Sequence, residues 1–216
     1  MKYFAFNLII LFSLCLRSSG VYGQDPAIKQ DSGKIITVHI IHGSKALKEY
    51  RKTEIPLLGG MRGGHVVNQV GDSVYGFQFS RWELHIFPRR KKEKKIGIIQ
   101  KEGVEDWKKQ FNEAKITSIE IPVSDTQFRE VLREYAQYKD NVPYDYAFFG
   151  MRCAASCYEV LSDAGVLSGK RHGKIIARFF YPRPLRKHLQ KLAKKNNYRI
   201  TTTEGTIRRK WEKNYR

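Results

Sequence analysis

The chain has 216 residues, and its 40 lysines and arginines outnumber 21 aspartates and glutamates, which gives a formal net charge of +19. This length suits one well-buried α+β domain and is too short for two. The positive charge attracts polyanions such as envelope glycans, lipid head groups and peptides with free carboxylates. Nucleic acid is disfavoured as a partner, because the sequence has no zinc-finger spacing, no aromatic RNA-binding signature and no basic heptad helix.

Residues 1–23 have the features of a secretory signal peptide. Lys2 gives a positive start, residues 4–16 are almost wholly apolar, and Gly23 closes a small-x-small cleavage pattern. The apolar run is about 13 residues, short of the ~20 that a spanning helix needs. Cys15 does not fit a lipoprotein box, because a leucine precedes it. The sequence therefore predicts export to the periplasm or the cell exterior, with no membrane anchor left after cleavage.

The remaining sequence predicts a mobile segment at 24–33, a single domain at 34–205 and a basic tail at 206–216. A glycine-containing turn at 71–73 joins two runs of strand-forming residues, which is typical of a β-hairpin. The Ser-Asp-Thr-Gln sequence at 124–127 is a capping box that begins a helix. The predicted strands are 34–41, 65–70, 74–79, 82–87, 96–99, 116–123 and 198–203, and the predicted helices are 104–111, 124–142, 153–164 and 184–196.

Two cysteines follow the signal segment, Cys153 and Cys157. A disulfide between them is disfavoured, because i and i+4 positions of a helix hold Cβ atoms ~5–6 Å apart and a bridge needs ~3.5–4.5 Å. Cys153 opens a predicted helix, where backbone N–H groups and a nearby imidazole would lower the pKa of a thiol. Cys157 shares a stripe with Val160 and Leu161 and is assigned to the core. Cys153 is therefore the candidate nucleophile, with a buried structural thiol as the alternative.

The candidate general base is His65, one of six histidines. It follows a glycine-rich approach and opens a strand, which leaves room for a substrate beside the ring. His39 lies inside an apolar strand and is interpreted as a hydrogen-bonded core histidine. His85 alternates with apolar residues and fits either the core or the site. The weaker candidates are a turn residue and two residues in basic, exposed surroundings: His42, His172 and His188.

A third polar residue is needed to orient the imidazole of a catalytic triad. Gln78 lies on the hairpin partner strand, between Phe77 and Phe79. In the alternative interpretation, Gln78 faces solvent while the two phenylalanines face inward. His85 and Asn68 are rivals for the same role.

The order of these segments resembles the circularly permuted (YiiX-type) branch of the NlpC/P60 papain-like superfamily. The resemblance rests on glycines before a strand-opening histidine at 63–65, Pro-Tyr-Asp-Tyr at 143–146 and Cys-Ala-Ala-Ser at 153–156, and it spans residues 59–165. It implies an α+β fold with a small, mostly antiparallel sheet packed against a cysteine-bearing helix. It also implies that Tyr144 helps to stabilise an oxyanion. The chain departs from the family in lacking an aromatic residue soon after the cysteine and a histidine in the third role.

The same resemblance implies hydrolysis of an amide or ester. Cys153 would attack a carbonyl carbon, His65 would accept and return the proton, and the Cys153 N–H with Tyr144 would hold the oxyanion. The mechanism needs no metal and no cofactor. Cleavage of amide bonds in cell-wall peptides is the first hypothesis. The alternatives are a lipid hydrolase or acyltransferase of the same fold, and a non-catalytic basic module that binds anionic envelope surfaces.

Overall fold

The computed structural model describes residues 33–51, 63–79, 97–140 and 142–212. The expected signal segment, nearly all of the expected mobile segment, the expected strand 82–87 with His85, and the basic run at 89–95 lie outside the described residues.

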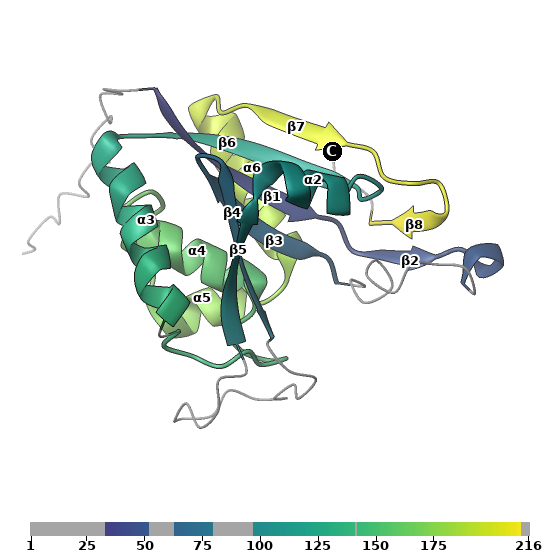
Figure 1. The fold of residues 1–216 in the computed structure, drawn as a ribbon, viewed down its shortest axis with the longest axis horizontal. Helices are drawn as coiled ribbons and strands as arrows, with labels where there is room; N and C mark the ends of the chain where they lie inside the picture. Colours follow the sequence, from purple (N-terminus) through teal and green to yellow (C-terminus); the bar gives the residue numbers. More distant parts are fainter. Residues whose placement is uncertain (1–32, 52–62, 80–96, 141, 213–216) are drawn as a thin grey trace, which may run out of the picture.

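The described part is an α+β fold built on a six-stranded antiparallel sheet (Figure 1). The strand order is β5-β4-β3-β1-β6-β7, so the predicted β3-β4 hairpin lies between the edge strand β5 and the central strand β1. The strands are β1 (Lys34–Ile41), β3 (His65–Val70), β4 (Ser73–Phe79), β5 (Gly97–Gly103), β6 (Ile116–Val123) and β7 (Ile200–Thr203).

Most of the predicted strands are confirmed, and β5 is longer than the sequence pattern suggested. Its polar second half, Gln100–Gly103, has weak strand propensity. It is nevertheless part of the strand because β5 pairs with the whole length of β4, from Ser73 opposite Gly103 to Phe79 opposite Gly97. Cross-strand pairing thus overrides the local preference of this segment.

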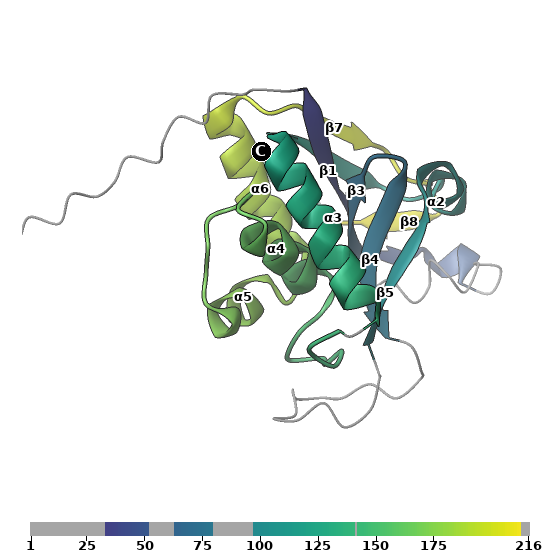
Figure 2. The same cartoon turned by 60° about the vertical axis from the view of Figure 1, so that its left-hand side comes forward.

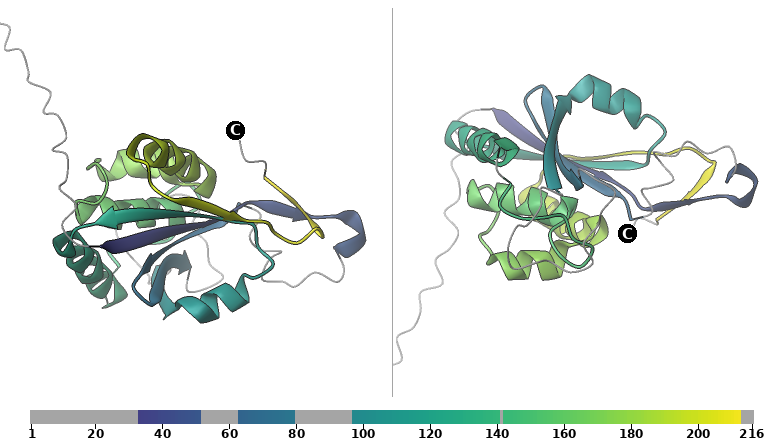
Figure 3. Two further views of the ribbon diagram at one scale, coloured as in Figure 1. Left: turned by 90° about the horizontal axis from the view of Figure 1, so that it is seen from above. Right: turned by 60° about the horizontal axis from the view of Figure 1, so that its bottom comes forward.

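Helices cover both faces of the sheet, unequally (Figures 2 and 3). Three helices pack on one face and a fourth packs against two of them, while α2 is the one described helix that covers the other face, beside β4 and β5. The helices are α2 (Val104–Gln110), α3 (Asp125–Asp140), α4 (Cys153–Asp163), α5 (His172–Phe179) and α6 (Pro182–Asn196). The sequence pattern did not predict α5, since its buried apolar positions are only Ile175 and Phe179.

Two hydrophobic cores lie on the two sides of the sheet. Val66 and Phe77 belong to the larger core, between the sheet and the layer of α3, α4 and α6. Val67 and Val74 belong to the smaller core, which Trp107 of α2 covers. Because side chains alternate along a strand, consecutive residues of β3 point to opposite layers. This alternation decides which functional groups can share a face.

Local signals at the helix ends behave as the sequence predicted. The backbone N–H of Gln127 donates to Ser124 Oγ at 3.2 Å, and the Ser124 N–H donates to Gln127 Oε1 at 3.0 Å. This reciprocal pair confirms the capping box of α3. At the end of α4, Gly165 adopts a φ of 68° and the Val166 N–H returns to Leu161 O at 2.8 Å. Local hydrogen bonds therefore fix the start of α3 and the end of α4.

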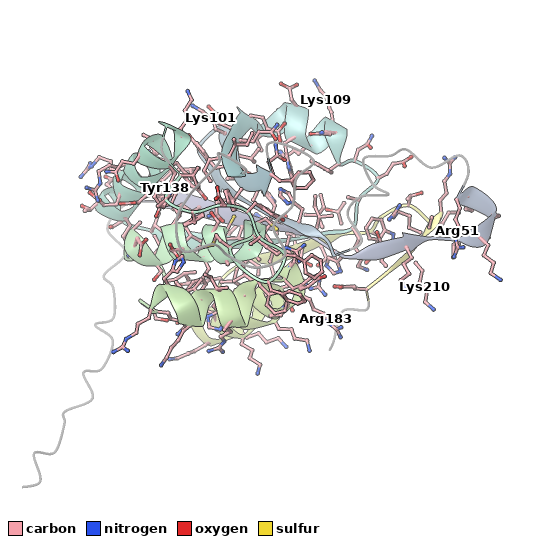
Figure 4. All side chains as sticks on the ribbon, turned by 90° about the horizontal axis from the view of Figure 1, so that it is seen from below. Arg51, Lys101, Lys109, Tyr138, Arg183 and Lys210 are labelled. Carbon is pink, nitrogen blue, oxygen red and sulfur yellow. The ribbon has the colours of Figure 1, made fainter. Side chains whose placement is uncertain are left out.

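A second, two-stranded sheet pairs β2 (Ser44–Ala46) with β8 (Arg209–Trp211), next to a short 3-10 turn, η1 (Lys48–Tyr50). Part of the expected basic tail is therefore ordered structure. Arg209 is buried, and its Nε donates to Ser44 Oγ at 2.8 Å. The pairing joins segments far apart in sequence, which no local pattern could predict. Figure 4 shows Arg51 and Lys210 at this protruding end, and Lys101, Lys109 and Arg183 elsewhere on the surface.

His42 follows β1 and is fully buried, so it is more than a turn residue. Its Nε2 lies 2.8 Å from Thr117 Oγ1, and burial, assisted by Arg186, lowers its pKa to about 4. Between pH 6.5 and 4 the unfolded chain binds the proton more readily, so stability is lost as the pH falls through this window. A shift of this size is worth up to about 3 kcal/mol.

We expect His42→Gln to make the free energy of unfolding less dependent on pH between 6.5 and 4. Urea unfolding at half-unit pH steps measures this slope. His39 and His65 also have lowered pKa values, so part of the slope will remain. A slope identical to that of the unmodified protein would show that His42 titrates normally in the folded state.

Candidate active site

The start of β3 is shaped by Gly64. Its φ is 82°, and a Cβ atom at this position would collide with the carbonyl oxygen of Ile41 on the neighbouring strand. Only glycine fits such close backbone approach at positive φ. Gly63 is also confined, since a Cβ there would lie 2.6 Å from Tyr181 Cε1. These two glycines let β3 begin at His65, opposite Ile41.

The imidazole of His65 is half-buried on the face of the sheet that α2 covers. Its Nε2 lies 3.2 Å from where a Cβ atom of Gly76 would be, next to the side chain of Val67. Gly76 therefore leaves the space that the ring occupies. Burial lowers the pKa of His65 to about 4, so the imidazole is neutral at pH 7. A neutral imidazole is the form that can accept a proton.

Cys153 is the first residue of α4, as predicted, and its side chain is buried. The backbone N–H groups of Val66 and Ala154 and the hydroxyl of Tyr146 are hydrogen-bonding neighbours of the thiol. Burial raises the pKa of Cys153, and this effect outweighs the opposing charge of Arg152 and the two N–H groups. The sequence predicted a lowered pKa for a thiol at a helix N-terminus, and this prediction is wrong for the resting thiol because burial raises its pKa.

The side chains of Cys153 and His65 both lie near the start of β3, but on opposite faces of the sheet. The thiol contacts the backbone of Val66, the residue after His65, whose side chain points into the α4 layer. The imidazole lies over Gly76 on the opposite face. Among the described residues, the hydrogen-bonding contacts of the thiol do not include the imidazole. One residue of backbone separates the two groups.

The tyrosine beside the thiol is Tyr146. The hydroxyl groups of Tyr144 and Ser156 share a hydrogen bond of 2.9 Å, and burial raises the pKa of Tyr144 well above its ordinary value. Tyr146 instead neighbours Cys153 and Arg152, and burial raises its pKa. The family resemblance implied that Tyr144 stabilises the oxyanion, but Tyr146 is the tyrosine that neighbours the thiol. The two tyrosines lie two positions apart in an irregular connection, so no periodicity could have distinguished them.

Gln78 lies on the same face as His65. Its side chain hydrogen-bonds to Gln100 on β5, and it lines the same cavity as the imidazole. Phe77 is fully buried on the other face, and Phe79 is 47% exposed. Gln78 thus neither projects freely into solvent nor contacts Cys153. Gln78 therefore stays a candidate for the residue that orients the imidazole of His65.

Asn68, a rival for that role, is on the opposite face. Its Nδ2 donates to the hydroxyl of Tyr135 at 2.7 Å and to Cys157 O at 3.1 Å. Cys157 is 2% exposed within the larger core, and its Sγ donates to Val66 O at 3.5 Å. Burial raises the pKa of Cys157 well above its ordinary value. The assignment of Cys157 to the core is confirmed.

Three further histidines have partners of their own. His39 lies between Ser118 Oγ and Gln69 Oε1, both at 2.8 Å, which confirms it as a hydrogen-bonded core residue. His172 Nδ1 lies 2.8 Å from Glu159 Oε2. His188 packs against aromatic rings of the larger core. These contacts leave His65 as the described histidine that lines the cavity near the cysteine.

The cavity has a volume of about 450 Å³ and lies at the strand end where β3, β4 and β5 meet α2. His65, Gln78 and Gly76 line it from the sheet, and Tyr146 and Arg152 line it from the connection before α4. Within the described ranges, no three histidine, cysteine, aspartate or glutamate side chains are grouped as metal ligands would be. The arrangement offers a neutral imidazole, a phenol and a guanidinium around a space lined by both apolar and polar side chains.

Comparison with known protein families, with curated proteins and with solved structures gives no significant match. The resemblance to the permuted NlpC/P60 branch therefore stays a prediction. In the part of the chain that the structure describes, no helix has the length and apolar character needed to cross a bilayer.

Proposed function

We propose that the chain is a cysteine hydrolase of the permuted NlpC/P60 type, with Cys153 as nucleophile and His65 as general base. The observation that supports this most is the contact between the Cys153 thiol and the backbone of Val66, next to His65. It brings a helix-opening cysteine to the first residues of the histidine strand. Its neighbours Arg152 and Tyr146 line a cavity large enough for a peptide or acyl group. The predicted signal segment suggests that the enzyme acts outside the cytoplasm.

The resting groups are a protonated thiol and a neutral imidazole, since burial raises one pKa and lowers the other. Attack therefore couples two events. The Cys153 sulfur bonds to the carbonyl carbon while His65 takes the thiol proton, and the imidazolium then protonates the leaving amine or alcohol. Water, deprotonated by His65, cleaves the resulting thioester. For this cycle, the imidazole must turn from Gly76 toward the start of β3, where the thiol lies at the backbone of Val66.

Two kinds of donor can hold the oxyanion of the tetrahedral intermediate. One is the set of N–H groups in the first turn of α4, and the other is the hydroxyl of Tyr146. We propose Tyr146, in place of Tyr144, for this role.

The substrate hypothesis is an amide in peptide material with free carboxylates, which the net charge of +19 would attract. An acyl-lipid ester is the enzyme alternative. A non-catalytic binding module is the second candidate function, and one observation favours it: Cys153 is only 2% exposed and its pKa is raised. All three bind anionic surfaces, so binding alone does not distinguish them.

Purified peptidoglycan and phospholipid vesicles, incubated with the protein, test the proposal. We expect release of new amino groups from the peptidoglycan, at a rate at least about 10³-fold lower in Cys153→Ala, whereas release of free fatty acid from the vesicles would indicate the acyl-lipid alternative. Cys157→Ala is the matched control, and it should keep the rate of the folded fraction. A protein that binds both materials, releases them at high salt and cleaves neither is the binding module.

The two tyrosines offer a second matched pair. We expect Tyr146→Phe to lower kcat by about 10²- to 10³-fold, in the range of a lost oxyanion donor, and Tyr144→Phe to change it less than about threefold. Steady-state kinetics of both variants measure the difference. Equal effects would remove Tyr146 from the oxyanion site.

A further inference from the structure

Arg152, the residue before Cys153, contributes a cation to the wall of the cavity. Its backbone is extended, with φ −137° and ψ 177°, and it caps α4 without a side-chain bond to the helix. Three aromatic rings surround the guanidinium. Its central carbon lies 4.5 Å from the ring centre of Tyr181, 5.2 Å from that of Phe148 and 6.0 Å from that of Tyr146.

The guanidinium has unused hydrogen-bonding capacity. Side-chain hydrogen bonds to Tyr146 and Tyr181 hold it in place. Its Nε and Nη1 atoms are buried and have no hydrogen-bond partner among the described residues. Arginine keeps its charge in proteins, and buried donors without partners are costly. A carboxylate is the group that pairs best with such donors.

No described carboxylate pairs with this cation: the ion pairs of the described part do not include Arg152. The cavity does contain Glu102, but at its other end. Glu102 pairs with Val74 on β4, whereas Arg152 sits by Tyr146, which packs on Phe79. Val74 and Phe79 are five residues apart, which is about 17 Å along a strand. The two charges therefore lie at opposite ends of the cavity.

We propose that Arg152 makes this cavity a binding site for an organic carboxylate with an apolar body. The aromatic walls would contact the body, and the unpaired guanidinium donors would hold the carboxylate next to Cys153. In the proposed hydrolase, whose function this part rests on, Arg152 selects substrates with a free carboxylate close to the bond that is cleaved. The binding itself does not require the thiol to react.

The test is equilibrium binding of a matched pair, 3-phenylpropionate and its neutral analogue 3-phenylpropanamide, followed by calorimetry and ligand-observed NMR. We expect the carboxylate to bind at least about tenfold more tightly to the unmodified protein. Arg152→Gln should abolish this preference, and Arg152→Lys should keep part of it. Lys174→Gln, an exposed cation on α5 in a separate groove, should leave it unchanged.

Equal affinity for the two compounds, or binding of neither, would overturn the proposal, and both results need only the unmodified protein. A preference for the carboxylate that survives in folded Arg152→Gln would also overturn it. So would an equal loss of this preference in Lys174→Gln, because the cause would then be the overall positive charge of the protein. Cys153→Ala separates the two claims. If the unmodified protein hydrolyses neither substrate and Cys153→Ala still prefers the carboxylate to the amide, the proposed function is refuted and the carboxylate site is supported.

Discussion

Replacing Gly64 by alanine is expected to lower the free energy of unfolding by about 3 kcal/mol or more, the largest stability effect that we predict for one methyl group. A Cβ atom would collide with the Ile41 carbonyl oxygen and lie 3.0 Å from the Gly43 nitrogen. Both obstacles are backbone atoms, which cannot rotate away. The φ of 82° adds the cost of a left-handed conformation. The start of β3, and with it His65, would shift.

Gly71→Ala is the matched control, because it shares the positive φ without the collision. Its φ is 59°, and the nearest atom to an added Cβ is Phe128 Cζ at 3.9 Å. We expect this variant to lose only about 1 kcal/mol. Urea unfolding of both variants gives the comparison. Losses of equal size would mean that conformation alone, rather than contact with Ile41, makes glycine necessary at position 64.

His65→Gln is expected to lower kcat by about 10³-fold with little change in KM, because it removes a proton acceptor that acts only during the reaction. Since the pKa of His65 is lowered to about 4 by burial, the proposed hydrolase should stay active at mildly acidic pH and lose activity as the pH falls through that value. The pH dependence of kcat/KM of the free enzyme measures this directly.

His39→Gln serves as the comparison for that experiment. His39 is buried, stacked on Trp107 with ring centres 4.9 Å apart, and bonded to Ser118 and Gln69. Its replacement should lower stability and leave kcat of the folded enzyme within about threefold of normal, because it lies outside the reacting groups. Similar losses of kcat in both variants would mean that His65 acts through structure and not as the base.

The elements with strong local signals were predictable from the sequence. The capping box at 124–127, the hairpin and the start of α4 depend on neighbouring residues, and each is found, although the hairpin turn is 71–72, one residue shorter than predicted. The pairing of β2 with β8 was not predictable, because the strands are more than 160 positions apart in the chain. Long-range pairing depends on packing that no local pattern records.

The candidate site was predictable at the level of elements and not of side chains. The sequence indicated that His65 opens a strand and Cys153 a helix, and both are so placed. It did not indicate that burial outweighs the helix N-terminus at the thiol, or that Tyr146 lies beside it. The unpaired donors of Arg152 are likewise a property of the packed structure. Desolvation is set by everything that surrounds a group, so it cannot be read from spacing.

The central claim is that Cys153 is a nucleophile, and the rate of alkylation of each cysteine tests it most directly. Cys153 and Cys157 are equally exposed, at 2%, but two neighbours of Cys153, Arg152 and Tyr146, line the cavity, whereas Cys157 lies within the larger core. With iodoacetamide at neutral pH and peptide mass spectrometry, we expect Cys153 to react at least about tenfold faster than Cys157. Equal rates, or negligible labelling of Cys153 in the folded protein, would contradict the assignment.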